Sequence, residues 1–222
     1  MTQLRDYIYH QEPAGVIYCG DCLKILPLLQ DKSIDLVLTD PPYGINLDTS
    51  YRKFINSPQY EKVMNDNIKF DPRPIIKQFC SIPIIIWGAQ NFCNLLPEKP
   101  GWIAWIKILK NGANIRQAEM ELAWTNFIKR SVGFRQTWIG AVRGSEANGR
   151  QLYHPTEKSI ELFRWCISLA KKSIGTVLDP FLGSGTTAVA AKQLGRKFIG
   201  VEICEAYCKI AVDRLRQEEL PL

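Results

Sequence analysis

Four short apolar runs of one design recur along the sequence, and each of them leads to an acidic residue. Runs this short and this apolar are typical of strands buried on both faces of a parallel sheet, because helices cover both sides of such sheets. The runs span residues 15–19, 34–39, 176–178 and 197–201, and the acids are Asp21, Asp40, Asp179 and Glu202. This pattern predicts an α/β fold with a mostly parallel sheet.

Helical spacing of apolar residues precedes the third run and follows the third and fourth. Residues 163–170 and 206–215 keep this spacing, and the small-residue stretch 186–194 ends at Gly195, a natural helix C-cap. Alternating strand and helix patterns predict a doubly wound open sheet. Ligands bind beyond the carboxyl ends of the strands in such sheets, so we expect the four acids to converge on one crevice. The alternative is that some of these acids cap helix N-termini, and Asp21 could do both.

The middle of the chain has a different composition. After Tyr43, basic residues mixed with Asn, Ser and Pro keep no apolar period, which predicts a mobile basic loop. Residues 84–87, 102–106 and 121–125 have the pattern of further strands. Since no repeat or linker divides the chain, we predict a single domain over residues 1–222, with its binding face built from the middle segment.

Basic residues are concentrated in one part of the chain. The formal net charge is +6, and residues 101–150 contain eight Lys or Arg against three Asp or Glu. A polyanion-binding surface needs such a zone, because binding releases the counterions of the phosphates. A solvated loop region explains the charge equally well, so charge alone leaves both interpretations open.

The cysteines and the hydropathy pattern argue against several classes of protein. Seven cysteines are an odd number, which argues against a disulfide framework, and the pairs Cys19/Cys22 and Cys204/Cys208 adjoin apolar runs where buried thiols are common. We predict reduced structural cysteines and no metal site, with a zinc or redox pair as the alternative. No apolar run approaches membrane-spanning length and the first residues lack a signal-peptide pattern, so we expect a cytoplasmic protein.

Residues 179–187 combine a strand end, a glycine-rich turn and the start of a helix. Gly183 and Gly185 let a ligand approach the backbone closely, and a helix N-terminus favours a carboxylate or a phosphate. The third glycine of the dinucleotide fingerprint is missing. Glu202 follows at the next strand end, where an acid accepts hydrogen bonds from ribose hydroxyls. The pattern predicts a cofactor that contains adenosine.

The tetrapeptide Asp40-Pro41-Pro42-Tyr43 suits chemistry on the exocyclic amine of a nucleobase. Such an amine is a poor nucleophile because its lone pair is delocalised into the ring. A carboxylate and a backbone carbonyl that accept its two N–H groups favour the localised form. The prolines stiffen the turn, and Tyr43 offers a flat face for an extruded base. A rigid turn with a solvent-facing tyrosine is the structural alternative.

With these motifs in order, the chain resembles the amino-methyltransferases of DNA in the arrangement called the β class. Asp40 to Tyr43 resembles the family's catalytic D-P-P-Y, residues 179–187 its D-P-F-x-G-S-G-T-T cofactor loop, and Gly200-Val201-Glu202 its ribose-binding acid. Gly20-Asp21-Cys22-Leu23 resembles the adenine-contacting segment, and residues 154–158 resemble the H-P-T-x-K element that helps to hold the methionine moiety. Glu157 and Ser159 depart from the family's usual glutamine and proline.

The resemblance implies a Rossmann-like class I methyltransferase fold in which the motifs are circularly permuted, since the glycine loop follows the D-P-P-Y. It implies S-adenosylmethionine as the cofactor. The catalytic residues would be Asp40, Pro41, Pro42 and Tyr43. Cofactor binding would fall to Asp21, Cys22, Asp40, His154, Thr156, Lys158, Asp179, Phe181, Gly183, Ser184, Gly185, Thr186, Thr187 and Glu202.

The expected activity is methyl transfer to N6 of an adenine flipped out of double-stranded DNA, with residues of about 101–150 as a compact recognition region. Trp124, Phe134 and Trp138 are candidates for a second wall of the base pocket. N4-cytosine methylation needs the same amine geometry, but that branch often has serine in place of Asp40. An RNA base-amine methyltransferase, a protein-glutamine methyltransferase and a silent DNA-binding homologue are further alternatives. We expect a monomer or homodimer, with a restriction endonuclease as a possible cellular partner.

Overall fold

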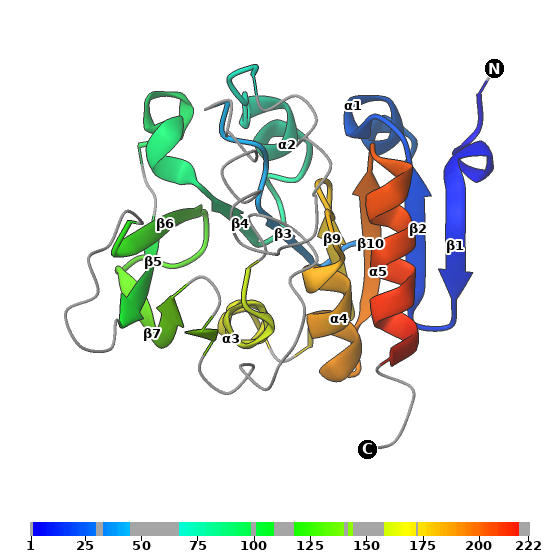
Figure 1. The fold of residues 1–222 in the computed structure, drawn as a ribbon. Helices are drawn as coiled ribbons and strands as arrows, with labels where there is room; N and C mark the ends of the chain where they lie inside the picture. Colours follow the sequence, from blue (N-terminus) through cyan, green and yellow to red (C-terminus); the bar gives the residue numbers. More distant parts are fainter. Residues whose placement is uncertain are drawn as a thin grey trace.

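The computed structural model describes residues 2–29, 33–44, 67–98, 101–108, 118–139, 142–143, 158–171 and 173–217. These residues form one sheet of ten strands with helices on both faces (Figure 1). The strands are β1 (Ile8–Glu12), β2 (Gly15–Cys19), β3 (Leu36–Thr39), β4 (Ile84–Trp87), β5 (Gly101–Ile108), β6 (Met120–Thr125), β7 (Val132–Ile139), β8 (Val142–Arg143), β9 (Thr176–Asp179) and β10 (Lys197–Glu202). The α-helices are α1 (Cys22–Ile25), α2 (Arg73–Gln78), α3 (Ile160–Leu169), α4 (Thr186–Gln193) and α5 (Glu205–Gln217).

The strand order across the sheet is β1-β2-β10-β9-β3-β4-β6-β5-β7-β8. The five strands from β2 to β4 in this order run parallel, whereas β6 runs antiparallel to both β4 and β5. The predicted parallel sheet is therefore confirmed, and all seven predicted strands are present. The antiparallel β6 matters for the site, because its first residues lie at the edge where the parallel strands end.

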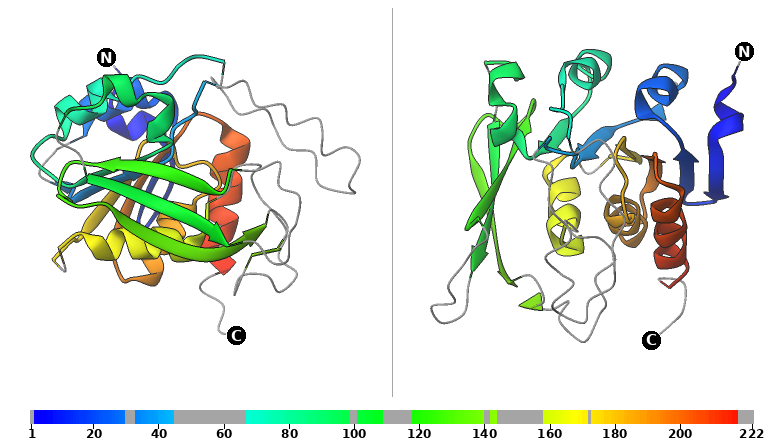
Figure 2. Two further views of the ribbon diagram at one scale, coloured as in Figure 1. Left: turned by 90° about the vertical axis from the view of Figure 1, so that its left-hand side faces the viewer. Right: turned by 45° about the horizontal axis from the view of Figure 1, so that its top comes forward.

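Strands alternate their side chains between two apolar layers. In β4, Ile85 and Trp87 face the layer formed with α3, α4 and α5, whereas Ile84 and Ile86 face the layer formed with α1 and α2. All four side chains are fully buried. Apolar residues at every position of such strands are what burial on both faces requires. Figure 2 shows the two helical layers on opposite sides of the sheet and confirms the doubly wound arrangement.

Helix α4 lies between α3 and α5 beside the sheet, and small side chains make this possible (Figure 1). Ala188, Ala190 and Ala191 are fully buried there. The helix ends before Gly195, whose φ of +65° is the left-handed conformation expected after a helix C-terminus. The predicted helices at 163–170, 186–194 and 206–215 are thus confirmed. No helix among the described residues is long and apolar enough to cross a membrane.

Several elements were not predicted. The edge strand β1 carries Tyr9, His10 and Gln11 among its five residues, and β7 mixes exposed and buried positions. Helices α1 and α2 have four and six residues, which is too short for a helical period to show. The expected loop after Tyr43 falls mainly on residues outside the described part of the chain.

Candidate functional site

Asp40 and Tyr43 follow β3 directly and form the centre of the site. The Tyr43 hydroxyl donates a hydrogen bond to Asp40 Oδ1 over 2.5 Å. The Lys158 ammonium group donates to Asp40 Oδ2 over 2.6 Å and to the Tyr43 oxygen over 3.1 Å. Each oxygen of the Asp40 carboxylate therefore has a donor from this chain. Oδ1 can accept a second hydrogen bond, so a ligand amine can bond beside the Tyr43 hydroxyl or in its place.

The Asp40–Lys158 pair is buried, with 16% and 5% of the two side chains exposed. Burial raises the pKa of the Asp40 carboxyl, and Lys158 works against that rise. Burial alone would lower the pKa of Lys158, but Asp40 and Glu121 raise it well above its ordinary value. Lys158 is therefore charged at neutral pH, and its charge is what stabilises the ionised form of Asp40.

The ring of Tyr43 lies against the backbone at the end of the neighbouring strand β4. Gly88, the next residue, has a φ of +73°, and a Cβ at this position would overlap the Tyr43 ring. Any residue other than glycine would thus be strained there and would push the ring away. The Lys158 ammonium group lies 5.6 Å from the centre of the same ring. Gly88 was not among the predicted site residues.

Two further charged residues extend this cluster on the face of the sheet that α3 covers. Glu121 on β6 lies 3.0 Å from the Lys158 ammonium group, and Lys107 on β5 lies 2.5 Å from the other oxygen of Glu121. Burial alone would raise the pKa of Glu121, but the two lysines lower it to about 2. Sequence reasoning missed Glu121. A carboxylate at the start of an otherwise apolar strand was the signal that could have found it.

Asp179 ends β9, the strand beside β3, and its carboxylate is enclosed by neutral donors. Oδ1 accepts hydrogen bonds from the Thr39 hydroxyl over 2.7 Å and from the Phe181 N–H over 3.0 Å. Oδ2 accepts from the Thr187 hydroxyl over 2.5 Å. Burial raises the pKa of Asp179 to about 6. Because Thr39 precedes Asp40, this hydrogen bond joins the glycine loop directly to the Asp40 segment.

Glu202 ends β10 and shapes the glycine loop from the other side. Its carboxylate accepts hydrogen bonds from the N–H groups of Gly183 and Cys204, each over 2.8 Å. Gly183 has a φ of +54°, and a Cβ there would meet nothing within 4 Å, so the loop leaves open space above this residue. Each carboxylate oxygen can accept a second bond, which leaves Glu202 able to receive ribose hydroxyls.

Arg214 of α5 holds the loop from below. Its guanidinium donates to the Ser184 carbonyl over 2.8 Å, to the Ser184 hydroxyl over 2.9 Å and to the Thr186 hydroxyl over 3.2 Å, and the residue is 1% exposed. The close packing continues at Gly185, where a Cβ would lie 2.7 Å from the Cβ of Ala211. The loop is thus fixed by contacts on its buried side, whereas a Cβ at Gly183 would point into open space. Arg214 was not predicted.

Three other predicted cofactor residues, Asp21, Cys22 and Phe181, follow the ends of β2 and β9. Asp21 accepts a hydrogen bond from the Leu23 N–H over 2.9 Å, so it is the N-cap of α1. Cys22 is buried, and burial raises the pKa of its thiol to about 12. Phe181 meets Phe70 edge-on at 5.3 Å between ring centres. His154 and Thr156 lie outside the described residues.

Two expectations about the middle segment are wrong. Trp124 is 1% exposed and packs inside the layer with α1 and α2, so it cannot wall an open pocket. Lys107 counted toward the basic surface, but its side chain is 8% exposed and paired with Glu121. Phe134 packs on Trp165 of α3, with ring centres 5.3 Å apart. The side chain of Trp138 lies outside the described part of the structure.

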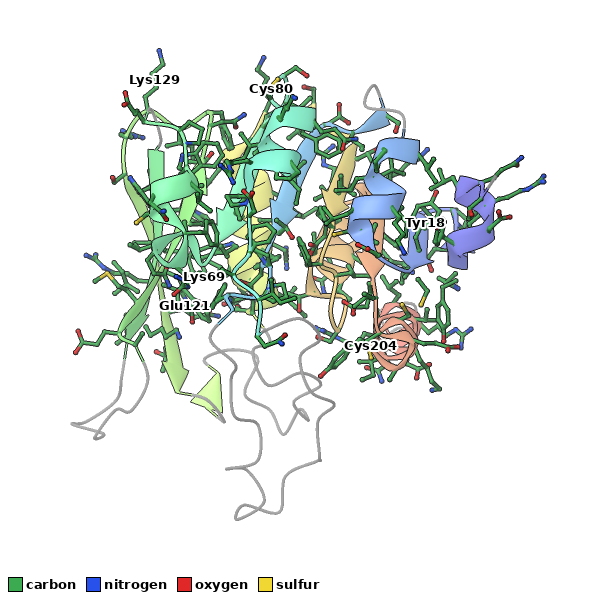
Figure 3. All side chains as sticks on the ribbon, turned by 90° about the horizontal axis from the view of Figure 1, so that it is seen from above. Tyr18, Lys69, Cys80, Glu121, Lys129 and Cys204 are labelled. Atoms are coloured by element: carbon green, nitrogen blue, oxygen red, sulfur yellow. The ribbon has the colours of Figure 1, made fainter. Side chains whose placement is uncertain are left out.

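Other basic residues of this segment do reach solvent. Lys129, Arg130 and Arg135 are exposed in and after the turn that joins β6 to β7. Figure 3 shows the Lys129 side chain projecting away from the ribbon, whereas Glu121 lies over the body of the molecule. All seven cysteines are free thiols. Within the described ranges, no group of three or more His, Cys, Asp or Glu is arranged to hold a metal ion.

Comparisons with known proteins give similarities over most of the chain. A family model described as DNA methylase matches residues 110–213, a stretch that includes Lys158, Asp179 and Glu202 but not Asp40. The type II methyltransferase M.HinfI of Haemophilus influenzae is 29% identical over 250 residues, which cover 91% of this chain and 68% of that protein.

Solved structures share the fold. A complex described as M1.HpyAVI–SAM has a TM-score of 0.55 and 22% identity, over 89% of this chain and 98% of that one. The PvuII DNA methyltransferase, described as cytosine-N4-specific, has a TM-score of 0.64 and 16% identity, over 97% and 91% of the two chains. These likenesses confirm the predicted class I methyltransferase fold.

Proposed function

We propose that this chain is an S-adenosylmethionine-dependent DNA methyltransferase that acts on an exocyclic base amine, specifically N6 of an adenine flipped out of duplex DNA. The observation that carries the proposal is the junction of the two predicted motifs. The Thr39 hydroxyl bonds to Asp179, so Asp40 and the glycine loop meet at one edge of the sheet. The similarity to DNA methylases over residues 110–213 supports the same proposal. The proposal includes the permuted, β-class motif order, in which β3 precedes β9 in the chain.

The residues at the strand ends fit the proposed cofactor. The open space above Gly183 admits a ligand against the backbone, and Glu202 has acceptor capacity left for ribose hydroxyls. The N-terminus of α4 follows the loop and favours a carboxylate such as that of a methionine moiety. S-adenosylmethionine, when bound, supplies a methyl group already activated by a sulfonium. Arg214 and Ala211 hold the loop in place from beneath.

Asp40 is the acceptor for the amine in this proposal. Its Oδ1 takes one amine N–H in place of the Tyr43 hydroxyl, and the Pro41 carbonyl takes the other. Accepting hydrogen bonds from both N–H groups localises the nitrogen lone pair, and positioning then contributes most of the remaining rate enhancement. Tyr43, released from Asp40, stacks on the flipped base. Lys158 stays on Oδ2 and keeps the carboxylate ionised.

Two features bear on which base and which polymer are used. Asp40 stands where the N4-cytosine branch often has serine, which favours adenine; cytosine N4 is the second candidate, because the PvuII protein of that description shares the fold. Of the exposed basic residues, Lys129 and Arg130 lie in the turn after β6, at the edge of the sheet opposite to Asp40. Arg135, on β7 beside Ile106, lies nearer to the site and offers a contact for a phosphate. An RNA base amine, the oligomeric state, a partner endonuclease and a cytoplasmic location stay predictions from the sequence.

The decisive experiment incubates purified protein with S-adenosylmethionine labelled on its methyl group. The acceptors are PCR-amplified genomic DNA, which carries no prior methylation, and a matched RNA transcript. Labelled N6-methyladenine in the DNA digest supports the proposal. Labelled N4-methylcytosine instead supports the second candidate, methylation of cytosine N4. Label in RNA alone, or in neither polymer, overturns it.

The role of Asp40 is tested in the same assay. We expect Asp40→Ala to abolish transfer, at a cost of at least about 10²-fold, because the amine loses its carboxylate acceptor. Binding of the cofactor, measured by calorimetry, should survive, since the loop contacts come from Asp179 and Glu202. Asp213→Ala, an exposed carboxylate on α5, is the control. Substantial turnover by Asp40→Ala would show that another group holds the amine.

A further inference from the structure

Beyond the motif residues, the site contains an unbroken row of four charges. It runs from Asp40 through Lys158 and Glu121 to Lys107, with closest separations of 2.6, 3.0 and 2.5 Å. The signs alternate, so the row is neutral as a whole. The exposed fractions of the four side chains lie between 5% and 17%, so water screens these charges weakly.

The row depends on strand direction. Trp105 of β5 pairs with Glu121 of β6, so Lys107, two residues on, is the diagonal neighbour of Glu121 on the same face. Because β6 is antiparallel to β4, a residue near its start reaches the edge where β3 ends. Lys158 comes from a third direction, two residues before α3 begins. Carboxylates from two other segments, Asp40 after β3 and Glu121 on β6, therefore converge on the ammonium group of Lys158.

We propose that Glu121 is a positioning residue for the methyl transfer: it shares the Lys158 ammonium group with Asp40, and Lys107 holds Glu121 in place. The inference rests on the proposed function. With Glu121 present, Lys158 is drawn toward β6 and touches a single oxygen of Asp40. The other oxygen is thereby left for the amine once Tyr43 moves. Without Glu121, Asp40 is the remaining carboxylate partner of Lys158, and the ammonium group then contacts both oxygens of Asp40.

The charge of Glu121 also tunes Asp40 as an acceptor. The groups that face Asp40 are Tyr43 on its own segment, Lys158 before α3, Glu121 on β6 and Asp179 at the end of β9. Glu121 opposes Lys158 by raising the pKa of Asp40. Removing this negative charge should lower the pKa of Asp40 and weaken its hydrogen bonds to the amine.

Glu121→Gln tests the inference, with methyl transfer and its pH dependence as the measurements. We expect kcat to fall roughly tenfold to hundredfold, because the acceptor is mispositioned, with little change in KM for cofactor or DNA. The acid limb of the kcat profile should move to lower pH, in the direction of the lowered Asp40 pKa. Glu119→Gln, an exposed residue two positions earlier, is the matched control and should behave as wild type.

A second variant keeps the test decisive if Glu121→Gln folds poorly. Glu121→Asp retains the charge but withdraws the carboxylate, so kcat should be intermediate and the acid limb should stay in place. Wild-type kcat and an unmoved acid limb in a folded Glu121→Gln protein would overturn the inference, since a purely structural ion pair predicts that result. Wild-type protein that methylates no nucleic acid would instead overturn the proposed function, and the two failures are thus distinct.

Discussion

Asp40 and Asp179 end adjacent strands of the sheet, yet their surroundings are opposite in kind. Asp40 is held by a lysine that is itself shared with Glu121, so charge is balanced by charge. Asp179 is held by two hydroxyls and one N–H, all neutral. Asp179 accepts three hydrogen bonds and is 3% exposed, so little of it is open to a ligand, whereas Asp40 is more exposed and the proposed amine exchanges with its Tyr43 donor. In the proposed mechanism, this difference separates a carboxylate that builds the loop from one that accepts a hydrogen bond from the amine.

The largest expected effect comes from removing the cation on the Asp40 side. Lys158→Met leaves burial and Glu121 to raise the pKa of Asp40 further, so a larger fraction of the carboxyl is protonated at a given pH and accepts no hydrogen bond from the amine. We expect transfer at pH 7 to fall at least about 10²-fold and to recover partly as the pH is raised. The pH profile of kcat checks this. A loss of equal size at every pH would mean that Lys158 acts by binding the cofactor, as its motif suggests.

The next effect concerns stability in acid. The pKa of Glu121 in the folded protein, about 2, lies below its ordinary value. The ionised carboxylate therefore adds to the free energy of unfolding above pH 4.5, and this stabilisation is lost as the pH falls toward 2. At pH 7, Glu121→Gln should lower the free energy of unfolding by roughly 3 kcal/mol. The difference from wild type should shrink in acid. Urea unfolding at several pH values measures it, and a constant difference would contradict the ionic origin.

Asp179 should show the opposite pH dependence. Its pKa is raised to about 6. The stabilisation that its protonated form gives the folded protein is therefore complete below the usual pKa of an aspartate and is lost as the pH rises through 6. Thr187→Val removes the hydroxyl from Oδ2 and should cost about 1–3 kcal/mol, more above pH 6 than below it. Thr176→Val, at the other end of β9, is the control. A larger loss in acid than in alkali would mean that the carboxyl donates rather than accepts.

The smallest effect tests how Tyr43 is seated. Gly88→Ala introduces a Cβ that overlaps the Tyr43 ring and should reduce kcat/KM several-fold. Gly195 has a similar positive φ, but a Cβ there would meet nothing within 4 Å. Gly195→Ala therefore has the same backbone cost, about 1 kcal/mol, without the clash. Thermal unfolding measures the shared cost, and turnover measures the difference. Equal turnover in the two variants would show that the position of the ring is unimportant.

The sequence predicted those parts of the site that depend on local order. A strand followed by an acid identified Asp40, Asp179 and Glu202, because the strand and the acid are neighbours in the chain. It could not predict Glu121, since β6 was recognised as a strand but its direction and register were not. Strand direction is set by long-range pairing, and reversing it would carry Glu121 to the far edge of the sheet.

The same limit explains the two wrong expectations. Trp124 was a candidate for the wall of the base pocket, and Lys107 was counted with the basic residues of the middle segment. Both lie on the paired strands β5 and β6 and are enclosed there. The burial of Arg214 likewise depends on α5 packing beneath a loop that starts thirty residues earlier, for which no local pattern exists. The helices were predicted where their apolar period was long enough, and α1 and α2 were missed because theirs was not.

The pairing of β3 with β9 has a consequence for the newly made chain. Thr39 and its partner Asp179 are 140 residues apart, and a ribosome adds about 5–20 residues each second. Roughly seven to thirty seconds therefore pass between the synthesis of the two strands. During that time β3, whose residues are all buried in the finished sheet, has one edge without its partner. An apolar strand with an open edge is prone to pair with other chains, so the yield of this protein in the cell should depend on chaperones that cover nascent strands.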